Sequence, residues 1–424
     1  MNTTETFEFL NSPLWLKHTH EHYRTPDEIY FRTKELMSAP KKWAETQSEI
    51  VALRKTNAIP LFINALDKKF WFFLSDCISR KALELELRGT QLHQRIIQNQ
   101  TFAEEFLRDA TIEEAITSAI YEGANSTRAQ AQELITSGSQ PKNKDEWMLL
   151  NNYGAMLWIK KNRDKSVSLD LVRELHAIVT RNTLEGDDAS FSGKFRNDLV
   201  YVRSRTGDIK HEGVEHKLIS PALEEAIELT TKNVRFFPPI LKGIILHYFL
   251  AYIHPFFDGN GRTARALFYF KAMKNNLSFV ELLSISAYLK VHGPQYERSY
   301  EKVVKNELDI TYFIDFNLDA LLHATSEVEK KVEILLGINA IKTALPSITN
   351  NQIGLIQKLV LNKFRKISIE EYALQIGMSR EVARQELKRL GDWGILAECK
   401  EGKKFVYQIK KTDLDAKLAT VRKK

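Results

Sequence analysis

The 424-residue sequence has only two cysteines, Cys77 and Cys399. Two thiols cannot form the disulfide framework of a small secreted domain, and neither lies in a CxxC or Cys/His spacing that would indicate structural zinc. The first residues lack a basic segment followed by an apolar core, so no secretory signal is expected. The most apolar stretch, residues 240–257, contains Lys242 and His247, which argues against a membrane span. These absences predict a protein of the reducing cytoplasm with no membrane partner.

Strand-like alternation is also scarce, and the sequence has no P-loop of the form GxxxxGK(S/T). Apolar residues instead recur at three- and four-residue steps, which is typical of amphipathic helices. The segments with this spacing are residues 70–86, 112–121, 147–159, 169–179, 238–253 and 264–273. Two short hairpins are the exceptions, one pairing residues 200–202 with 217–219 and one pairing 395–397 with 405–407. The sequence therefore predicts a mainly α fold with little sheet.

Charge is unevenly distributed along the chain. Lys and Arg number 61 against 54 Asp and Glu, a net charge of +7, but residues 341–424 alone contain 18 basic and 9 acidic residues. A neutral body with a basic C-terminal part suggests separate tasks for the two. The spacing in residues 348–412 predicts three short helices and the second hairpin, the order of a winged helix-turn-helix.

The third helix of that segment is expected to begin at Ser379 as its N-cap. Arg380, Arg384 and Lys388 then form a basic stripe that could meet DNA phosphates. Domains of this kind also serve as protein contacts, and the sequence does not decide between the two.

A short segment beginning at His254 interrupts the helical pattern, and its twelve residues are HPFFDGNGRTAR. The helix before it must end because the residue preceding Pro255 is pushed out of the α region. Helical spacing resumes at about Arg262. Residues 259–261 between the two helices can adopt positive φ angles and leave backbone N–H groups open. Such donors at a helix N-terminus predict an anion-binding site.

The side chains of this segment supply the groups that phosphoryl or nucleotidyl transfer needs. Arg262 and Arg265 are three residues apart, on one side of the first helical turn. Asp258 offers a hard oxygen ligand for Mg²⁺ beside phosphates. His254 can take a proton from an incoming hydroxyl as a neutral imidazole. The residues alone do not choose between nucleotide transfer and kinase-like phosphate transfer.

Two other interpretations of the segment compete with this one. Residues 259–264 also match the dinucleotide pattern G-x-G-x-x-G/A, with Glu281 downstream, but a helix and a proline precede them where a β-strand is required. A simple capped turn with a hydrogen-bonded core histidine would leave two arginines beside a glycine loop without an anion. Both therefore account for less of the segment than an anion site does.

The segment resembles the motif of the Fic family, HxFx(D/E)GNGRxxR, at every defined position. The resemblance implies transfer of a nucleotide, usually AMP from ATP, onto a Ser, Thr or Tyr hydroxyl of a protein. It also implies that His254 is the general base and Asp258 the Mg²⁺ ligand. The nucleotide-binding residues implied within the motif are Gly259, Asn260, Gly261, Arg262, Thr263 and Arg265, the last for the γ-phosphate.

A second match lies upstream, where Ser118 to Gly123 resemble the family's inhibitory pattern, (S/T)xxxE(G/N). By this resemblance Ser118, Glu122 and Gly123 are inhibitory residues. A helix that presents Glu122 to Arg265 would form an ion pair and remove the partner of the γ-phosphate. Tyr121 stands where many relatives have isoleucine, which should change packing rather than the ion pair.

Two further segments resemble parts of the family fold. Residues 193–196, followed by the hairpin at Val200, resemble the flap that would hold an extended target segment by strand addition. Tyr300 follows Ser299 where many relatives have two tyrosines that line the adenine pocket, so Tyr300 is the expected base contact.

The resemblance implies a Fic helical-bundle core with a small β-hairpin flap, between an N-terminal helical region and the C-terminal winged helix-turn-helix. The expected boundaries are 1–110 for the N-terminal helical region, 111–325 for the Fic domain with its inhibitory helix at about 112–124, 326–347 for a connecting helix and linker, and 348–412 for the winged helix-turn-helix.

The sequence thus predicts a self-inhibited protein adenylyltransferase that uses ATP and Mg²⁺. Its expected partners are a hydroxyl of a target protein, the chain itself as a target, and a second copy of the chain in a homodimer. One alternative is a DNA-binding regulator whose Fic fold senses a nucleotide. Another is a Fic enzyme that removes AMP or uses a different nucleotide.

Overall fold

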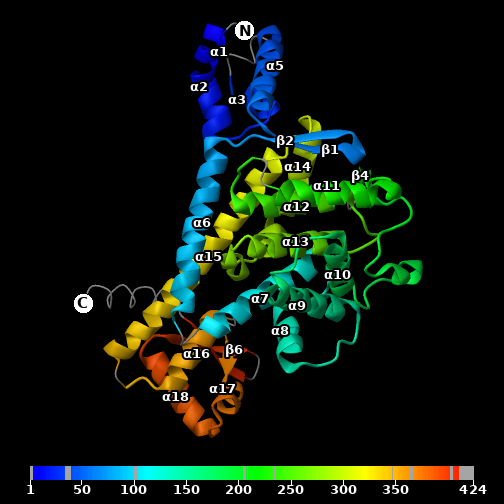
Figure 1. Cartoon of the computed structure of the whole chain (residues 1–424). Coiled ribbons are helices and arrows are strands. Elements are labelled where there is room, and N and C mark those ends of the chain that lie inside the picture. Colours follow the sequence, from blue (N-terminus) through cyan, green and yellow to red (C-terminus); the bar gives the residue numbers. More distant parts are fainter. Residues whose placement is uncertain are drawn as a thin grey trace. The chain divides into compact units, whose positions relative to one another are not determined.

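The computed structural model describes residues 3–33, 40–99, 103–203, 207, 209–232, 235–345, 347–361, 366–401 and 404–409. Helices dominate this part of the chain, and the strands form three small antiparallel sheets (Figure 1). This confirms the mainly α fold class.

The chain divides into two compact units, Met1–His93 with Ala110–Thr325, and Gln94–Asp109 with Ser326–Lys424. The domain boundaries expected from the sequence stay predictions. None of the helices in the described ranges is both long enough and apolar enough to cross a bilayer.

Two helices at the centre of the first unit carry the candidate site. They are α12 (Pro239–Ile253) and α13 (Asn260–Lys274), joined by residues 254–259. Nearly every side chain of both helices is buried, as expected for helices that are covered on all sides. The helices that pack against this pair are α9 (Lys144–Asn162), α10 (Leu169–Val179) and α11 (Ile219–Thr231). The loop between α12 and α13 is therefore held by a rigid scaffold.

The predicted inhibitory segment is the end of a longer helix, α7 (Ala103–Tyr121). Ile112, Ile116 and Ala119 form one apolar face, which packs with side chains of α8 (Arg128–Ser137) and α9. Gly123 ends the helix at φ +97°, where the backbone N–H groups of Gly123 and Ala124 donate to carbonyls of the last turn. This left-handed ending favours glycine because a Cβ atom would strain the backbone.

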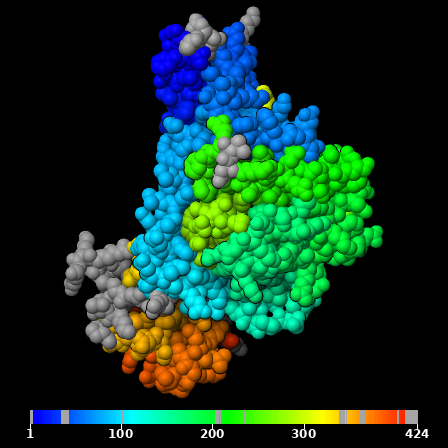
Figure 2. All heavy atoms as spheres, in the orientation of Figure 1, coloured from blue at the N-terminus to red at the C-terminus, as the bar shows by residue number. Residues whose placement is uncertain are grey.

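The first unit contains further elements. They are α1 (Thr3–Leu10), α2 (Pro13–Trp15), α3 (Pro26–Arg32), α5 (Pro40–Thr56), β1 (Ile59–Ile63), β2 (Lys68–Phe72), most of α6 (Asp76–Ile97), β3 (Tyr201–Arg203), β4 (Ile209–Glu212), α14 (Ile285–Lys305) and the first part of α15 (Thr311–Ala344). In the space-filling view, the atoms of residues about 120–260, teal to green, form one continuous body (Figure 2).

Two predictions of secondary structure in this unit are wrong. Residues 70–72 belong to strand β2, although the helical spacing was expected to begin at Phe70. Their side chains are nevertheless buried, so the aromatic run belongs to the core. A run of consecutive apolar residues has no period of its own, and here pairing with β1 decides the strand.

The partner of the first predicted hairpin is also different. Strand β3 pairs with β4, with Tyr201 opposite Glu212, and not with residues 217–219. The segment His216–Leu218 is a 3₁₀ turn, and Ile219 already begins α11. Three residues are too few to distinguish a strand from the entry to an amphipathic helix.

The second unit contains the elements in the order expected for its last part. After α15 come α16 (Asn350–Leu361), β5 (Ile367–Ser368), α17 (Ile369–Ile376), α18 (Arg380–Asp392), β6 (Leu396–Glu401) and β7 (Lys404–Ile409). The sheet order is β5-β7-β6, and Ser379 caps α18 by accepting a hydrogen bond from the Val382 N–H. Arg380, Arg384 and Lys388 are exposed.

The assignment of these elements as a winged helix-turn-helix stays a prediction, and so does their binding to DNA. Residues 410–412 at the end of the expected segment lie outside the described residues.

Candidate active site

The loop between α12 and α13 is closed by the side chain of Asn260. Its amide donates to the Phe256 carbonyl at 2.7 Å, and its oxygen accepts from the Phe256 N–H at 3.0 Å. Gly259 has φ +80°, and a Cβ atom there would lie 2.5 Å from Thr180 Cγ2. Both residues were expected to hold phosphates. The structure commits the Asn260 side chain to the shape of the loop, so that phosphate binding by these two residues, which stays a prediction, would use their backbone groups.

Those backbone groups are the first N–H donors of α13. The first hydrogen bond at this end runs from the Thr263 N–H to the Gly259 carbonyl at 3.0 Å, so the N–H groups of residues 260–262 precede the helical ladder. Gly259 has no side chain with which to cap them. The Thr263 hydroxyl, also expected at the nucleotide, donates to the same Gly259 carbonyl at 2.8 Å. Three N–H donors and the helix dipole therefore make an anion site.

His254 ends α12 in the left-handed conformation, with φ +53° and ψ +60°. Its Nδ1 lies 3.1 Å from the Ala251 carbonyl oxygen. Because a carbonyl can only accept, Nδ1 carries the proton and Nε2 has a free lone pair. Burial lowers the pKa of His254 to about 4, despite the hydrogen bond to Ala251, so the imidazole is neutral near pH 7.

Arg196 holds the backbone on which His254 stands. Its guanidinium is buried and donates to the His254 carbonyl at 2.8 Å, and its own N–H donates to the Pro255 carbonyl at 3.0 Å. It also donates to the Val214 carbonyl next to the flap hairpin. The sequence marked Arg196 only as part of a flap-like segment. Its task as a brace for the strained histidine could not be predicted, because it depends on carbonyls that are distant in sequence.

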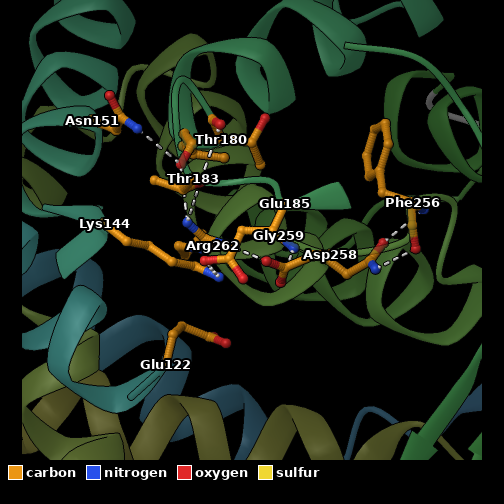
Figure 3. A network of polar contacts seen from close by, with 12 residues as sticks. Glu122, Lys144, Asn151, Thr180, Thr183, Glu185, Phe256, Asp258, Gly259 and Arg262 are labelled. Carbon is orange, nitrogen blue, oxygen red and sulfur yellow. Dashed lines mark hydrogen bonds and ion pairs between the residues drawn. The ribbon is translucent and has the colours of Figure 1, made fainter. Parts of the chain in front are cut away.

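Arg262 and Asp258 form a second polar pair at the loop (Figure 3). The buried Arg262 guanidinium donates to the Val179 carbonyl at 3.1 Å, and its Nη2 lies 3.2 Å from Asp258 Oδ2. The Asp258 side chain is 49% exposed at the mouth of the loop. The described residues contain no cluster of three or more His, Cys, Asp or Glu side chains that could hold a metal. Asp258 thus fits an ion that takes its other ligands from phosphates and water, as Mg²⁺ commonly does.

His176 on α10 is a site residue that the sequence did not indicate. Its Nδ1 accepts from the Gly193 N–H at 3.0 Å, and its Nε2–H donates to the Asp258 carbonyl at 2.9 Å. The ring also stacks on Phe256, with 3.6 Å between centroids. Burial lowers the pKa of His176 to about 4, so it stays neutral and links the flap segment to the loop. Its helical spacing placed it on a buried face, but no motif connected it with the loop.

Arg265 meets the predicted inhibitory residues directly. Its Nη2 lies 2.8 Å from Glu122 Oε1, and its Nε and Nη2 donate to Ser118 Oγ at 3.1 and 2.9 Å. A Cβ atom on Gly261 would lie 2.3 Å from the same Glu122 oxygen, so this carboxylate stands over the first turn of α13. Burial opposes the charge of Arg265, yet Glu122 and other acidic groups raise its pKa. Gly123 contributes only its backbone conformation.

Tyr300 lies in a cluster of tyrosines on α14. Its hydroxyl is 2.8 Å from that of Tyr296, which in turn is 2.9 Å from His247 Nε2. Tyr121 packs edge-to-face on Tyr296, with 6.1 Å between centroids, and its ring centre lies 5.4 Å from the guanidinium carbon of Arg265. Tyr296, which the sequence did not indicate, therefore links the expected base contact to the inhibitory segment.

Comparisons with known proteins point to the family whose motif the loop resembles. Residues 166–271 match the model of the Fic/DOC family. Two curated relatives, each named protein adenylyltransferase Fic, come from Drosophila erecta and Aedes aegypti. They are 28% and 29% identical to this chain over 244 and 241 residues, which cover 54% of this chain and 45% of each relative. The chain thus spans less than half the length of these relatives.

A solved structure of a Fic family protein from Desulfovibrio desulfuricans G20 has a similar fold. Its TM-score is 0.50 at 18% sequence identity, and the alignment covers 78% of this chain and 96% of that one. At this identity the likeness concerns the fold alone.

Proposed function

Because residues 166–271 match the Fic/DOC family model, we propose that this chain is a protein adenylyltransferase that moves AMP from ATP to a Ser, Thr or Tyr hydroxyl of a protein. One observation carries the proposal. An imidazole with a free Nε2 and a set of open N–H donors stand at opposite ends of the same braced loop. This arrangement supports the proposal, because a base for a hydroxyl and a site for phosphates would then belong to one loop.

In the proposed reaction His254 Nε2 accepts the proton of the target hydroxyl. The hydroxyl oxygen then bonds to the α-phosphorus of ATP, the bond from that phosphorus to the α,β-bridging oxygen breaks, and pyrophosphate leaves. A neutral imidazole can begin this transfer at pH 7, because burial keeps the pKa of His254 at about 4. The proton on Nδ1 stays with the Ala251 carbonyl and fixes the orientation of the ring.

Backbone N–H groups of residues 260–262 and the Arg262 guanidinium would bind the α- and β-phosphates. Asp258 would hold Mg²⁺, which when bound neutralises phosphate charge during transfer. Arg262 is already anchored at the Val179 carbonyl, so it needs little reordering to meet a phosphate. Arg265, the other buried cation of the motif, would bind the γ-phosphate.

We further propose that Glu122 inhibits the enzyme. Its carboxylate pairs with Arg265 and stands over Gly261, where a phosphate held by the first turn of α13 would come close. A triphosphate must therefore displace this carboxylate or bind in a shifted position. Ser118 keeps Arg265 in place while this happens.

The test is intact-mass spectrometry of the Glu122→Gly chain after incubation with Mg²⁺ and each nucleoside triphosphate, alone and with cell-lysate proteins. We expect a gain of one AMP with ATP, and no gain when His254→Ala is added. Labelling that survives His254→Ala would exclude the proposed base. Release of AMP from a pre-labelled target by the wild-type chain would instead favour the enzyme that removes AMP.

A further inference from the structure

Three acceptors follow one another at four-residue intervals along the end of α7: Glu114, Ser118 and Glu122. Residues at this spacing share one face of a helix. The backbone continues this geometry past the helix end, because the Glu122 N–H donates to the Ser118 carbonyl at 3.3 Å. Ser118 and Glu122 both contact Arg265, whereas Glu114 hydrogen-bonds to a different helix and acts on Arg265 through its charge, which helps to raise the pKa of Arg265.

Glu114 is anchored on the N-terminus of α14. Its carboxylate is only 3% exposed and accepts three hydrogen bonds. These come from the Ser284 hydroxyl at 2.8 Å, the Ser286 N–H at 3.1 Å and the Ser286 hydroxyl at 2.6 Å. Ser284 is the N-cap of α14, and its hydroxyl also lies 2.9 Å from Thr117 Oγ1. A buried carboxylate at this position is stabilised by the helix dipole as well as by its donors.

The same two helices meet again near the nucleotide site. Tyr121 on α7 packs edge-to-face on Tyr296 of α14, and a Cβ atom on Gly293 would lie 3.4 Å from the Tyr121 ring. Helices α7 and α14 are thus joined at two points on the same side of α7. The first point fixes how far α7 can slide or rotate, and the second lies within one residue of Glu122.

We propose that Glu114 is a positioning residue for autoinhibition, whose anchorage on Ser284 and Ser286 fixes the position of α7 at which Glu122 meets Arg265. This inference rests on the proposed inhibition by Glu122. If Glu114 only anchors the fold, replacing it changes activity whether or not Glu122 is present. If Glu114 positions Glu122, replacing it changes activity only when Glu122 is present. Epistasis between the two residues therefore separates the roles.

The experiment measures AMP incorporation for Glu114→Gln and Ser286→Ala, each in the full-length wild-type and Glu122→Gly backgrounds. Glu133→Gln, which alters an exposed acid on α8, is the matched control. In the wild-type background we expect both test variants to raise incorporation about fivefold or more, the lower end of common coupling factors. In the Glu122→Gly background we expect changes no larger than about twofold, because the carboxylate to be positioned is gone.

A second readout is the Kd for ATP, measured in chains that also carry His254→Ala so that no turnover occurs. This Kd should fall for Glu114→Gln and Ser286→Ala by a factor similar to the rise in AMP incorporation. The fall should again occur only when Glu122 is present. Thermal unfolding followed by circular dichroism shows whether each variant folds. If Glu114→Gln does not fold, Ser286→Ala decides, because it removes a single hydroxyl.

Two results would overturn the inference. One is an equal loss of activity in both backgrounds, which would make Glu114 an anchor of the fold only. The other is unchanged incorporation in the wild-type background while Glu122→Gly is active. If Glu122→Gly itself gives no labelling, the proposed autoinhibited transferase is refuted, and this inference is refuted with it.

Discussion

Replacing Glu122 by glutamine tests whether charge or bulk blocks the phosphate site. Glutamine keeps the size of the side chain over Gly261 but removes its negative charge. A phosphate bound by the first N–H groups of α13 would lie within about 4 Å of the carboxylate, where two unit charges repel by about 4 kcal/mol near a protein surface. The Glu122 side chain is 27% exposed, so solvent screens part of this repulsion. If about 2 kcal/mol of the repulsion remains after screening, removing it raises the ATP affinity roughly 30-fold.

The assay is isothermal titration of Mg·ATP into Glu122→Gln and Glu122→Gly chains, both with His254→Ala to prevent turnover. We expect Glu122→Gln to bind ATP about 30-fold tighter than the parent. Glu122→Gly should bind at least as tightly, because it also frees volume. Raising the salt concentration should reduce the difference in ATP affinity between the parent and Glu122→Gln. Salt screens the repulsion between the Glu122 carboxylate and a phosphate but does not change the bulk of the side chain.

Two results would refute this reasoning. If Glu122→Gln binds ATP no tighter than the parent while Glu122→Gly does, bulk rather than charge blocks the site. If neither variant gains affinity, the carboxylate over Gly261 does not oppose nucleotide binding at all. Glu133→Gln, which alters an acid far along α8, should leave the affinity unchanged.

Three further predictions follow from the loop. The activity of Glu122→Gly should be constant from about pH 8 to pH 5 and fall at lower pH, because protonation of His254 near its pKa of about 4 removes the base; a midpoint near 6.5 in the pH–rate profile would contradict the burial of the ring. Gly259→Ala should lower ATP affinity about tenfold or more, since the added Cβ strains a positive φ and meets Thr180. Gly138→Ala is the control in the same ATP titration, because Gly138 also has a positive φ but an added Cβ atom there meets no other atom within 4 Å. Asn260→Ala should lower the free energy of unfolding by about 2–4 kcal/mol in urea denaturation, because two buried backbone groups of Phe256 lose their partners; an unchanged value would show that the loop closes without it.

The parts of the site that the sequence predicted are those whose chemistry is local. The break at Pro255, the glycines after it and the return of helical spacing lie within twelve residues, so backbone rules alone predict an anion site at the start of α13. The structure contains the loop and the helix start, and the binding of an anion there stays a prediction. The contact of Glu122 with Arg265 was predicted from a resemblance rather than from spacing, and the structure contains it. Its inhibitory effect stays a proposal.

The parts that the sequence did not indicate depend on tertiary contacts. His176 and Tyr296 bind backbone carbonyls or rings that are distant in sequence, so no local pattern marks them. Arg196 was marked only as part of a flap-like segment, and its contact with the His254 carbonyl is likewise distant in sequence. The strand partner of β3 was misplaced for a related reason. Strands of three or four residues show at most two periods of alternation, and their pairing across the hairpin cannot be read from periodicity.

The pairing of Arg265 offers a physical reason why the proposed inhibition and the proposed phosphate binding would depend on one residue. A guanidinium that is 2% exposed needs an anion or several acceptors, because an unpaired buried charge is strongly destabilising. Ser118 supplies acceptor oxygens but no charge. Before nucleotide binds, a carboxylate is therefore the simplest partner that keeps this arginine buried and ready for a phosphate. If Arg265 binds ATP as proposed, the contact with Glu122 stabilises the buried cation and, by the same contact, lowers the affinity for the nucleotide.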